Sequence, residues 1–234
     1  MIAVRTKPSM LRTMAEHAAV EFANADTATV LAWTSAMFTD RWVVASNMQD
    51  AVLIDLAVAV KPDVPVLFLD TGYHFAETIG TRDAIAAAYP RVKVLNATAE
   101  QTVAEQEAEF GTLYSTDPNR CCHLRKVLPL RQTLAGYYAW VTGVRRADGP
   151  GRAAAPLISW DERNELVKIN PLAAWSDERF ERYLTDHEVL RNPLVAAGYP
   201  SIGCAPCTSK PLPEGDLRSG RWAGTGKTEC GLHG

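Results

Sequence analysis

The chain of 234 residues is 47% hydrophobic, which is enough to bury the core of one domain, with or without a small appendage. Its formal net charge of −3 at pH 7 lacks the basic excess that is typical of nucleic-acid-binding proteins, so we expect no nucleic-acid partner. The most apolar stretch, Ala51 to Val60, is too short to span a membrane and contains Asp55, so we expect no membrane partner.

The amino terminus lacks the basic, apolar and small-residue order of a secretory signal, and we therefore expect a cytoplasmic protein. In that compartment thiols stay reduced, so the five cysteines favour metal or redox chemistry over a disulfide framework. An odd number of cysteines fits four metal ligands and one reactive thiol.

Hydrophobic patterns predict alternating helices and strands along much of the chain. In chain order they are a helix over 8–32, a strand over 41–46, a helix over 50–60, a strand over 64–70, a helix over 75–89, a strand over 92–96, a polar helix near 102–110, a helix over 124–136 and a strand over 138–143. Continuous apolar strands that alternate with helices are typical of an α/β fold. We therefore expect a mainly parallel sheet that is covered by helices on both faces.

Ligands of such sheets bind at the carboxyl ends of the strands. Here these ends are residues 46–50, 70–74 and 143–146. The first of them is a turn between a strand and a helix, so its backbone N–H groups could hold an anion. It lacks the glycines of a usual phosphate loop, however, and an ordinary helix cap would explain it as well.

The composition changes near residue 200. Residues 200–234 are rich in Gly and Pro and poor in periodic apolar residues, and three of the five cysteines lie there. We expect residues 1–199 to form the α/β domain. Residues 200–234 should form a loop-rich segment that ends in a mobile tail and belongs to the same functional unit.

Two cysteine pairs could supply four thiolates to one metal centre. Cys121 and Cys122 are adjacent, and Cys204 and Cys207 form a C-x-x-C pair that by itself would indicate structural zinc. Adjacent Cα atoms are about 3.8 Å apart, and consecutive side chains do not face the same way on a helix or strand. Binding of both adjacent thiolates to one tetrahedral ion is therefore strained. A cubane cluster offers separate iron corners, so the spacing favours an iron–sulfur cluster over zinc.

The fifth cysteine, Cys230, lies on a tail that contains several glycines. A free cysteine has a pKa of about 8.5, which leaves a few per cent of thiolate at neutral pH. Lys227 and His233 would increase that fraction, and Glu229 would oppose them. The glycines would allow the thiol to move between a bound substrate and a reductant. The alternative is a stray exposed cysteine without a role.

Basic residues gather beside these motifs, although the mean charge is acidic. Arginine suits bidentate recognition of phosphate or sulfate. Any one of these residues could be a solvated surface charge, but their position beside the cysteines and the strand ends favours an anion site. The group comprises Arg125, Lys126, Arg145, Arg146, Arg152, Lys210, Arg218 and Arg221.

Taken together, these motifs resemble the adenylyl-sulfate reductases of assimilatory sulfate reduction. That family is related to the phosphoadenylyl-sulfate reductases and, in fold, to the ATP pyrophosphatases. The resemblance spans Ser46 to His233. It is carried by LDTGYHF at 69–75, CC at 121–122 with RK at 125–126, WVTG at 140–143 with RR at 145–146, GCAPC at 203–207 and ECGLH at 229–233.

The resemblance implies an ATP-pyrophosphatase-like fold (adenine nucleotide alpha hydrolase-like), in which 1–199 is the nucleotide-binding catalytic domain. It implies a thioredoxin-dependent enzyme that serves sulfate assimilation and cysteine biosynthesis. Cys230 would attack the sulfur of adenosine 5′-phosphosulfate to give a Cys S-sulfonate and AMP. Thioredoxin or a similar dithiol would then release sulfite.

The resemblance also implies roles for individual residues. Cys121, Cys122, Cys204 and Cys207 would hold one 4Fe–4S cluster per chain. Lys126 would lie between the cluster and the substrate and, with His233, would take part in catalysis beside Cys230, and the nearby Arg125 would bind substrate. The phosphosulfate would be contacted by Arg152, Arg218, Arg221 and His233, and the adenosine pocket would be lined by Ser46, Leu69 and Gly143.

Three alternatives remain open at this point. A phosphoadenylyl-sulfate reductase would perform the same chemistry on a 3′-phosphorylated substrate, but relatives of that type typically lack both cysteine pairs. An adenylating ATP pyrophosphatase would not need Cys230. A nucleotide-binding protein with a structural zinc site would have no catalytic activity. The sequence does not set the oligomeric state, and a homo-oligomer is allowed.

Overall fold

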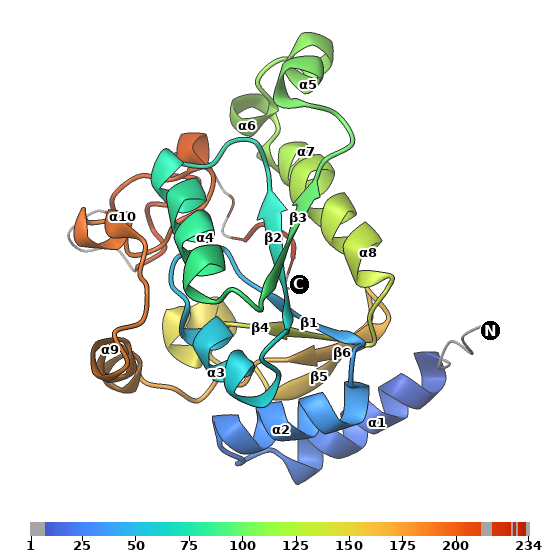
Figure 1. Ribbon diagram of the computed structural model, residues 1–234. Helices are drawn as coiled ribbons and strands as arrows, with labels where there is room; N and C mark the ends of the chain where they lie inside the picture. Colours follow the sequence, from blue (N-terminus) through green and yellow to red (C-terminus); the bar gives the residue numbers. More distant parts are fainter. Residues whose placement is uncertain (1–7, 212–216, 226, 228, 233–234) are drawn as a thin grey trace.

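The computed structural model describes residues 8–211, 217–225, 227 and 229–232. Within them six strands form one sheet in the order β3-β2-β1-β4-β6-β5 (Figure 1). The strands are β1 (Trp42–Ala45), β2 (Pro65–Asp70), β3 (Lys93–Thr98), β4 (Ala139–Thr142), β5 (Ile158–Asp161) and β6 (Leu166–Ile169). All neighbouring strands are parallel except β5 and β6, which form an antiparallel pair at one edge. The expected mainly parallel sheet is confirmed.

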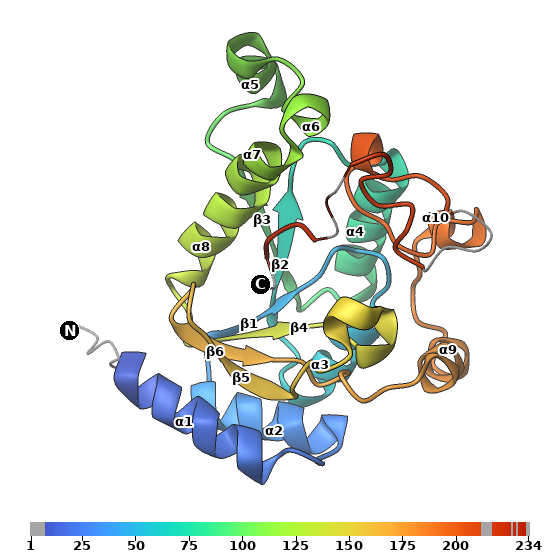
Figure 2. The same cartoon turned by 180° about the vertical axis from the view of Figure 1, so that it is seen from behind.

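Helices connect and cover these strands (Figures 1 and 2). The α-helices are α1 (Pro8–Glu21), α2 (Thr27–Phe38), α3 (Val52–Val60), α4 (Ala76–Ala88), α5 (Val103–Phe110), α6 (Leu113–Thr116), α7 (Pro118–Cys122), α8 (Leu128–Leu134), α9 (Asp177–Asp186) and α10 (Pro193–Ala196). A π-helix, His123–Val127, joins α7 to α8, and short 3₁₀ turns lie at Arg146–Asp148, Pro150–Arg152 and Ala205–Cys207.

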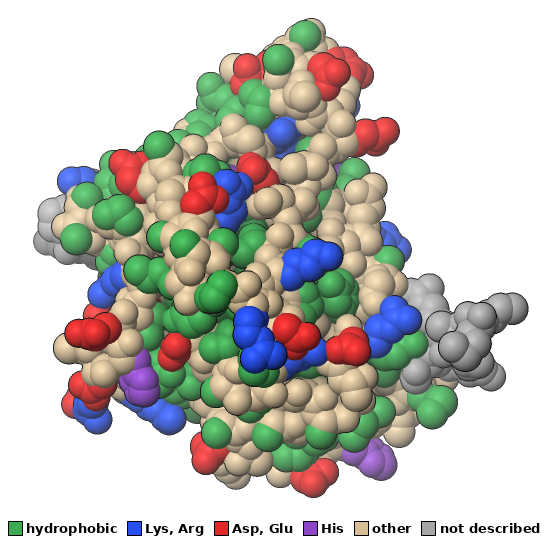
Figure 3. Space-filling model, in the orientation of Figure 1, with side chains coloured by type: hydrophobic (Ala, Val, Ile, Leu, Met, Phe, Trp, Pro, Cys, Tyr) green, Lys and Arg blue, Asp and Glu red, His purple; other side chains and the backbone are tan. Residues whose placement is uncertain are grey.

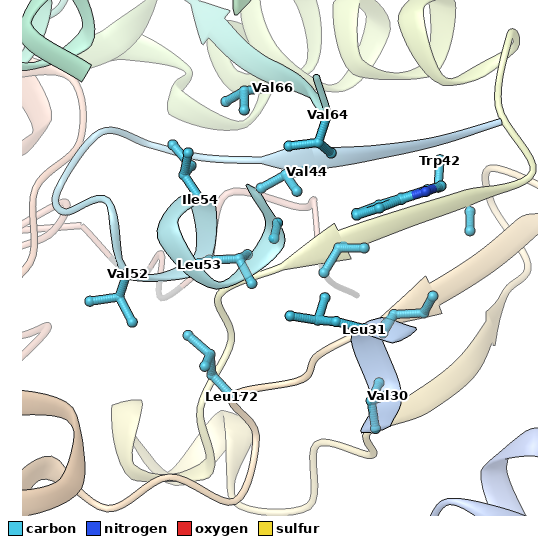
Figure 4. Packing of buried hydrophobic residues seen from close by; sticks show 14 of the residues in the cluster. Val30, Leu31, Trp42, Val44, Val52, Leu53, Ile54, Val64, Val66 and Leu172 are labelled. Atoms are coloured by element: carbon cyan, nitrogen blue, oxygen red, sulfur yellow. The ribbon is translucent and has the colours of Figure 1, made fainter. Parts of the chain in front are cut away.

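The sheet has a hydrophobic core on each face because successive strand residues point to opposite sides. On β1, Trp42 and Val44 enter the larger core, which also contains residues of α1, α2, α3 and α9, whereas Val43 enters a second core with Leu130 and Leu134 of α8. Figure 4 shows part of the larger core, in which residues of α2 and α3 surround the two β1 side chains. Helices therefore cover both faces, as expected.

The stretch 8–32, which was expected to be helical, contains a break. Helix α1 ends at Glu21, and α2 begins at Thr27 and continues to Phe38. Asp26 caps α2, since its carboxylate accepts a hydrogen bond from the backbone N–H of Thr29 at 2.8 Å. Such a side-chain cap satisfies a helix N–H that would otherwise lack a partner. The alanine-rich helical pattern continues on both sides of this break, so the sequence does not show where one helix ends and the next begins.

Two features of the region between 143 and 200 were not expected from the residue pattern. One is the β5–β6 hairpin, which extends the sheet beyond β4, and the other is α9, which packs against the larger core. In the described part of residues 200–234 the only helix is one 3₁₀ turn, in agreement with a loop-rich segment.

The described surface carries charges of both signs. On the face shown in Figure 3, basic and acidic side chains are interspersed. No helix among the described residues is long and apolar enough to cross a bilayer.

Candidate active site

A cavity of about 280 Å³ lies at the carboxyl ends of β1, β2 and β4. The sheet order changes direction here, because the chain adds strands on one side of β1 up to β3 and then continues on its other side with β4. Such a switch point leaves a crevice between the connecting loops. Ser46, Leu69 and Gly143, one from each strand end, all line it. These three segments thus meet at one cavity, and its use as a ligand site stays a prediction.

Basic side chains from distant parts of the chain converge on this cavity. Five line it: Lys126, Arg145, Arg152, Arg218 and Arg221. Arg145 is paired with Asp148 at 3.0 Å and with Asp177 at 2.8 Å, and Arg152 and Arg218 also have acidic partners. The four cations other than Arg145 come from the π-helix, from a 3₁₀ turn and from the C-terminal segment. Their convergence in a partly enclosed space favours an anionic ligand.

The other basic residues of the expected anion site lie elsewhere. Arg146 is exposed and donates to the carbonyl of Ala155, and Lys210 extends over the ring of Tyr199. Arg125 is buried, and it lines the cysteine cavity described below rather than the large cavity.

Arg125 holds the loop after β2 in place. Its guanidinium donates to the backbone carbonyl of Thr71 and also, at 3.2 Å, to the carbonyl of Gln101 and the side chain of Gln106. The hydroxyl of Thr71 is in turn 3.3 Å from the sulfur of Cys204. The expectation that Arg125 contacts substrate is therefore not supported by its position.

Arg221 is seated against the backbone of Gly203. Its guanidinium donates to the carbonyl of Ile202 at 3.0 Å. A Cβ atom on Gly203 would lie 2.0 Å from Nη2 and 2.3 Å from Cζ of Arg221. Among the described residues, Nε of Arg221 has no hydrogen-bond partner although it is buried. A buried donor without a partner is costly unless a ligand satisfies it.

We expect Gly203→Ala to weaken the binding of anionic nucleotides about tenfold, because the new methyl group displaces a guanidinium that makes charged hydrogen bonds. Titration calorimetry with AMP measures this. Gly80→Ala on α4 is the matched control, since nothing lies within 4 Å of a Cβ there. Equal AMP affinity in the two variants would contradict this role of Gly203.

The four cysteines of the two pairs line a second, smaller cavity, together with Lys126 and Trp222. All four thiols are free, and the two pairs come from segments more than 80 residues apart. Among the described residues, however, no group of three or more His, Cys, Asp or Glu side chains is arranged to hold a metal ion. The lining of this cavity thus brings four free thiols together, and the described thiols do not enclose a single ion.

The π-helix between α7 and α8 shapes this cavity. The backbone N–H of Leu128 bonds to the carbonyl of His123, five residues earlier, so one turn is wider than in an α-helix. Cys121 and Cys122 end α7 directly before it, and Lys126 lies within it. Both thiols thus line this cavity from the end of α7, and Lys126 lines it from the wide turn.

Lys126 lies between the two cavities and lines both. Its burial works against the charged form, but the facing thiolates of Cys204 and Cys230 outweigh burial, so the pKa of Lys126 is raised. Burial raises the pKa of Cys121 to about 11, and the neighbouring cysteines add to this effect. For Cys204, burial is outweighed by Lys126 and by the hydrogen bond from Thr71, so its pKa is lowered. The ammonium of Lys126 therefore stabilises negative charge on both sides.

The C-terminal tail reaches into the large cavity, where Cys230 and Leu232 line its wall. Arg163 donates to the backbone carbonyl of Gly231 at 2.9 Å, and the side chain of Lys227 donates to that of Asn119. Leu232 packs against the second hydrophobic core. The tail thus places Cys230, the one cysteine that does not line the cysteine cavity, beside the converging cations. His233 lies outside the described residues.

Sequence reasoning did not identify several residues that line the large cavity. Among them are His74, Trp222, Asp50 and Asp148. His74 lies within the segment 69–75, and Trp222 directly follows Arg221. Both the segment and Arg221 were singled out in the sequence. Asp148 gives no signal in the sequence, because its role depends on the 3₁₀ turn that brings it next to Arg145 and Arg152.

Asp50 is a carboxylate at the wall of this cavity. Burial raises its pKa to about 6 from an ordinary value of 3.8, and a hydrogen bond from the backbone N–H of Val52 and the charges of Arg191 and Arg145 only partly oppose this. Nearby Asp148 adds to the increase. The charged form of Asp50 is therefore disfavoured in the folded protein.

A raised pKa gives a definite dependence of stability on pH. Above pH 6 the folded protein carries a charge that is less favourable than in the unfolded chain, and this cost disappears as the pH falls from about 6 to about 4. We expect Asp50→Asn to increase the free energy of unfolding by roughly 1–3 kcal/mol at pH 7.5, with the advantage vanishing near pH 4. Urea unfolding across this range tests it, and an advantage that does not change with pH would refute it.

Comparisons with known proteins match this arrangement. Residues 41–210 match the family model described as "Phosphoadenosine phosphosulfate reductase domain". The adenosine 5′-phosphosulfate reductase of Mycolicibacterium smegmatis is 61% identical over 95% of this chain and 94% of its own length. The protein of the same name from Rhodococcus erythropolis is 58% identical over 98% of this chain and 97% of its own.

Solved structures show a similar fold. The phosphoadenylyl-sulfate reductase of Candida auris has a TM-score of 0.71 at 26% identity, over 85% of this chain and 97% of its own. The FMN adenylyltransferase of Candida glabrata has a TM-score of 0.56 at 16% identity, over 87% of this chain and 66% of its own, which is a likeness of fold alone. These similarities confirm the expected type of α/β fold.

Proposed function

Because the chain belongs to the phosphoadenosine phosphosulfate reductase family, we propose that it is an adenylyl-sulfate reductase of sulfate assimilation. The observation that carries the proposal is the position of Cys230. Its thiol lines the same cavity as the three strand ends and the converging cations. A nucleophile, a nucleotide-sized space and a site for negative charge therefore occur together.

In this proposal the adenosine of adenosine 5′-phosphosulfate lies against Ser46, Leu69 and Gly143. The phosphosulfate faces Arg152, Arg218 and Arg221, as well as Lys126. These cations serve catalysis because a thiolate cannot approach an anionic sulfate until its charge is neutralised. His233, four residues after Glu229, is proposed as a further contact.

The Cys230 thiolate attacks the sulfur atom, a Cys–S bond to the sulfonate forms, and the bond from sulfur to the phosphate oxygen breaks. AMP leaves with that electron pair. One thiolate of a dithiol such as thioredoxin then attacks the Cys230 sulfur, forms a mixed disulfide with it and releases sulfite with the electron pair of the S–S bond. The second thiolate attacks the reductant's sulfur in this mixed disulfide, which frees the Cys230 thiolate and leaves the reductant as a disulfide. The tail is placed for both steps, because it is held by a few polar contacts at the surface.

The donor set of the cysteine cavity fits a 4Fe–4S cluster. Among the described residues its lining comprises four free thiols, the ammonium of Lys126 and the guanidinium of Arg125, with no carboxylate. Adjacent cysteines can each bind a separate iron atom, and thiolates are the usual ligands of such clusters. When bound, the cluster would supply a fixed charge beside the substrate site and would orient Lys126, without itself changing redox state. We propose Cys121, Cys122, Cys204 and Cys207 as its ligands.

The remaining parts of the proposal follow from the same chemistry. Residues 1–199 act as the nucleotide-binding catalytic domain, and residues 200–234 complete its active site with Cys204, Cys207 and Cys230. Thioredoxin or a similar dithiol protein is the proposed reductant, and the cytoplasm, where such dithiols are kept reduced, is the proposed location.

Mass spectrometry of the intact protein tests the function. Protein purified without oxygen is incubated with adenosine 5′-phosphosulfate and no reductant, and in parallel with the 3′-phosphorylated nucleotide. We expect the mass of one SO₃ to be added at Cys230 with the first nucleotide. A faster reaction with the second would reassign the substrate, and no adduct from either, with fully metallated protein, would refute the reductase function.

A further inference from the structure

The residue before the nucleophile is paired with two of the cavity cations. The Glu229 carboxylate accepts hydrogen bonds from Nε and Nη2 of Arg152 at 3.3 and 3.4 Å, and from Nη2 of Arg218 at 3.1 Å. Both arginines line the large cavity beside Cys230. The tail thus places a negative charge on guanidinium groups that face the ligand site.

A carboxylate and a phosphate or sulfate group use the same donors. Guanidinium forks bind either anion through two parallel N–H bonds, so the Glu229 carboxylate and an anionic ligand compete for Arg152 and Arg218. The arginine side chains are only 16% and 19% exposed, whereas that of Glu229 is 38% exposed. Water therefore reaches the carboxylate more readily than the two arginines, and an ion pair of this exposure is weak enough to be replaced.

The chemistry of the ligand decides what happens to the tail. If the ligand anion takes over the two arginines, Glu229 loses its partners and the adjacent Cys230 is no longer fixed by them. The contacts of Lys227 with Asn119 and of Arg163 with the Gly231 carbonyl do not involve these arginines. They would keep the tail at the cavity while the thiol adjusts its position.

We propose that Glu229 is a positioning residue that occupies the anion subsite of Arg152 and Arg218 while no substrate is bound, and that the anionic group of the substrate displaces it. The proposal rests on the proposed function, because it assumes an anionic nucleotide in this cavity. It assigns to Glu229 two effects: it keeps Cys230 in place before substrate arrives, and it makes entry of the substrate depend on the ligand's charge.

Affinities of the holoprotein for AMP and for adenosine test the competition, since the second ligand has no anionic group. We expect Glu229→Gln to bind AMP about fivefold more tightly than the wild type, because a competing charge is gone, and to bind adenosine with unchanged affinity. Glu16→Gln is the matched control: Glu16 is exposed on α1, pairs with Arg12, and does not line the cavity.

Weaker AMP binding by Glu229→Gln would mean that the carboxylate holds the arginines ready for substrate, and would overturn the proposal. An equal change for AMP and adenosine would overturn it as well. Failure of the wild type to bind AMP at all would instead contradict the proposed function, so the two failures are distinguishable.

Alkylation of Cys230 by iodoacetamide, followed by peptide mass spectrometry, tests the second effect. In ligand-free holoprotein we expect the modification of Cys230 in Glu229→Gln to be several-fold faster than in the wild type and in Glu16→Gln. Identical rates in all three proteins would show that the pair with Arg152 and Arg218 does not hold the thiol.

Discussion

Replacement of Cys230 with serine is expected to abolish sulfite formation, with a loss of at least about 10³-fold, while AMP affinity and the metal content stay unchanged. A serine hydroxyl is hardly ionised at neutral pH, so it cannot replace a thiolate nucleophile. The cavity proposed for the nucleotide is built mainly from strand ends and cations, and these do not depend on the Cys230 sulfur. Sulfite production with a dithiol reductant, titration with AMP and iron analysis measure the three quantities.

The intact-mass experiment adds a direct control for Cys230→Ser. The variant should gain no SO₃, whereas the wild type should gain one. Sulfite formation by Cys230→Ser at the wild-type rate would exclude Cys230 as the nucleophile. Loss of iron from the same variant would place Cys230 among the metal ligands. The proposal that the cysteine cavity binds the metal and that the tail supplies the nucleophile would then be wrong.

The second large effect is expected for Cys122→Ala, which should lose the iron, the brown colour and the catalytic activity together. Cys122 is buried and lines the cysteine cavity with the other three thiols. A cluster with one missing thiolate is exposed to solvent and to oxidation. Since metal binding contributes to the stability of the fold that supplies the ligands, the variant should also unfold at a lower denaturant concentration.

Cys230→Ala is the matched control for this change, because it also removes a thiol, but one that does not line the cysteine cavity. This variant should keep its iron. Iron and sulfide analysis, visible absorption and urea unfolding of both variants give the comparison. Full iron content in Cys122→Ala would remove this residue from the ligand set. Zinc in place of iron in the wild type would favour the protein with a structural zinc site considered above.

Much of the fold follows from patterns in the sequence. The apolar strands 41–46, 64–70 and 138–143 are largely buried on both faces, so their hydrophobic runs are continuous and easy to identify. The strand 92–96 lies at the sheet edge and is only partly buried, but it keeps several apolar residues. The hairpin of β5 and β6 lies at the sheet edge, where residues such as Lys168 and Asp161 face partly toward solvent. Ser159 and Lys168 interrupt the apolar residues of its two strands, so neither strand gives a continuous hydrophobic run.

The candidate site, like the fold, could be predicted from the sequence only in part. The strand ends, the cysteine pairs and most of the basic residues are local features, and the sequence indicates them directly. The direction of a long side chain is not local: Arg125 and Lys126 are neighbours, yet one holds the loop after β2 and the other reaches the large cavity. Asp148 pairs with arginines that a 3₁₀ turn orients, whereas Glu229 pairs with Arg218 and with the distant Arg152. No pattern in the sequence indicates such pairs.

The π-helix His123–Val127 has a consequence for how this chain can change its length. This wide turn holds one residue more than an α-helical turn, so deletion of one residue there would restore a regular α-helix and leave α7 and α8 in nearly the same relative orientation. Deletion of one residue from α8 has no wide turn to absorb it, so it would rotate Cys121 and Cys122 by about 100° about the helix axis, away from Cys204 and Cys207, although no thiol had been replaced. We therefore expect the cysteine cavity to tolerate deletion of His123 better than deletion of one residue within α8.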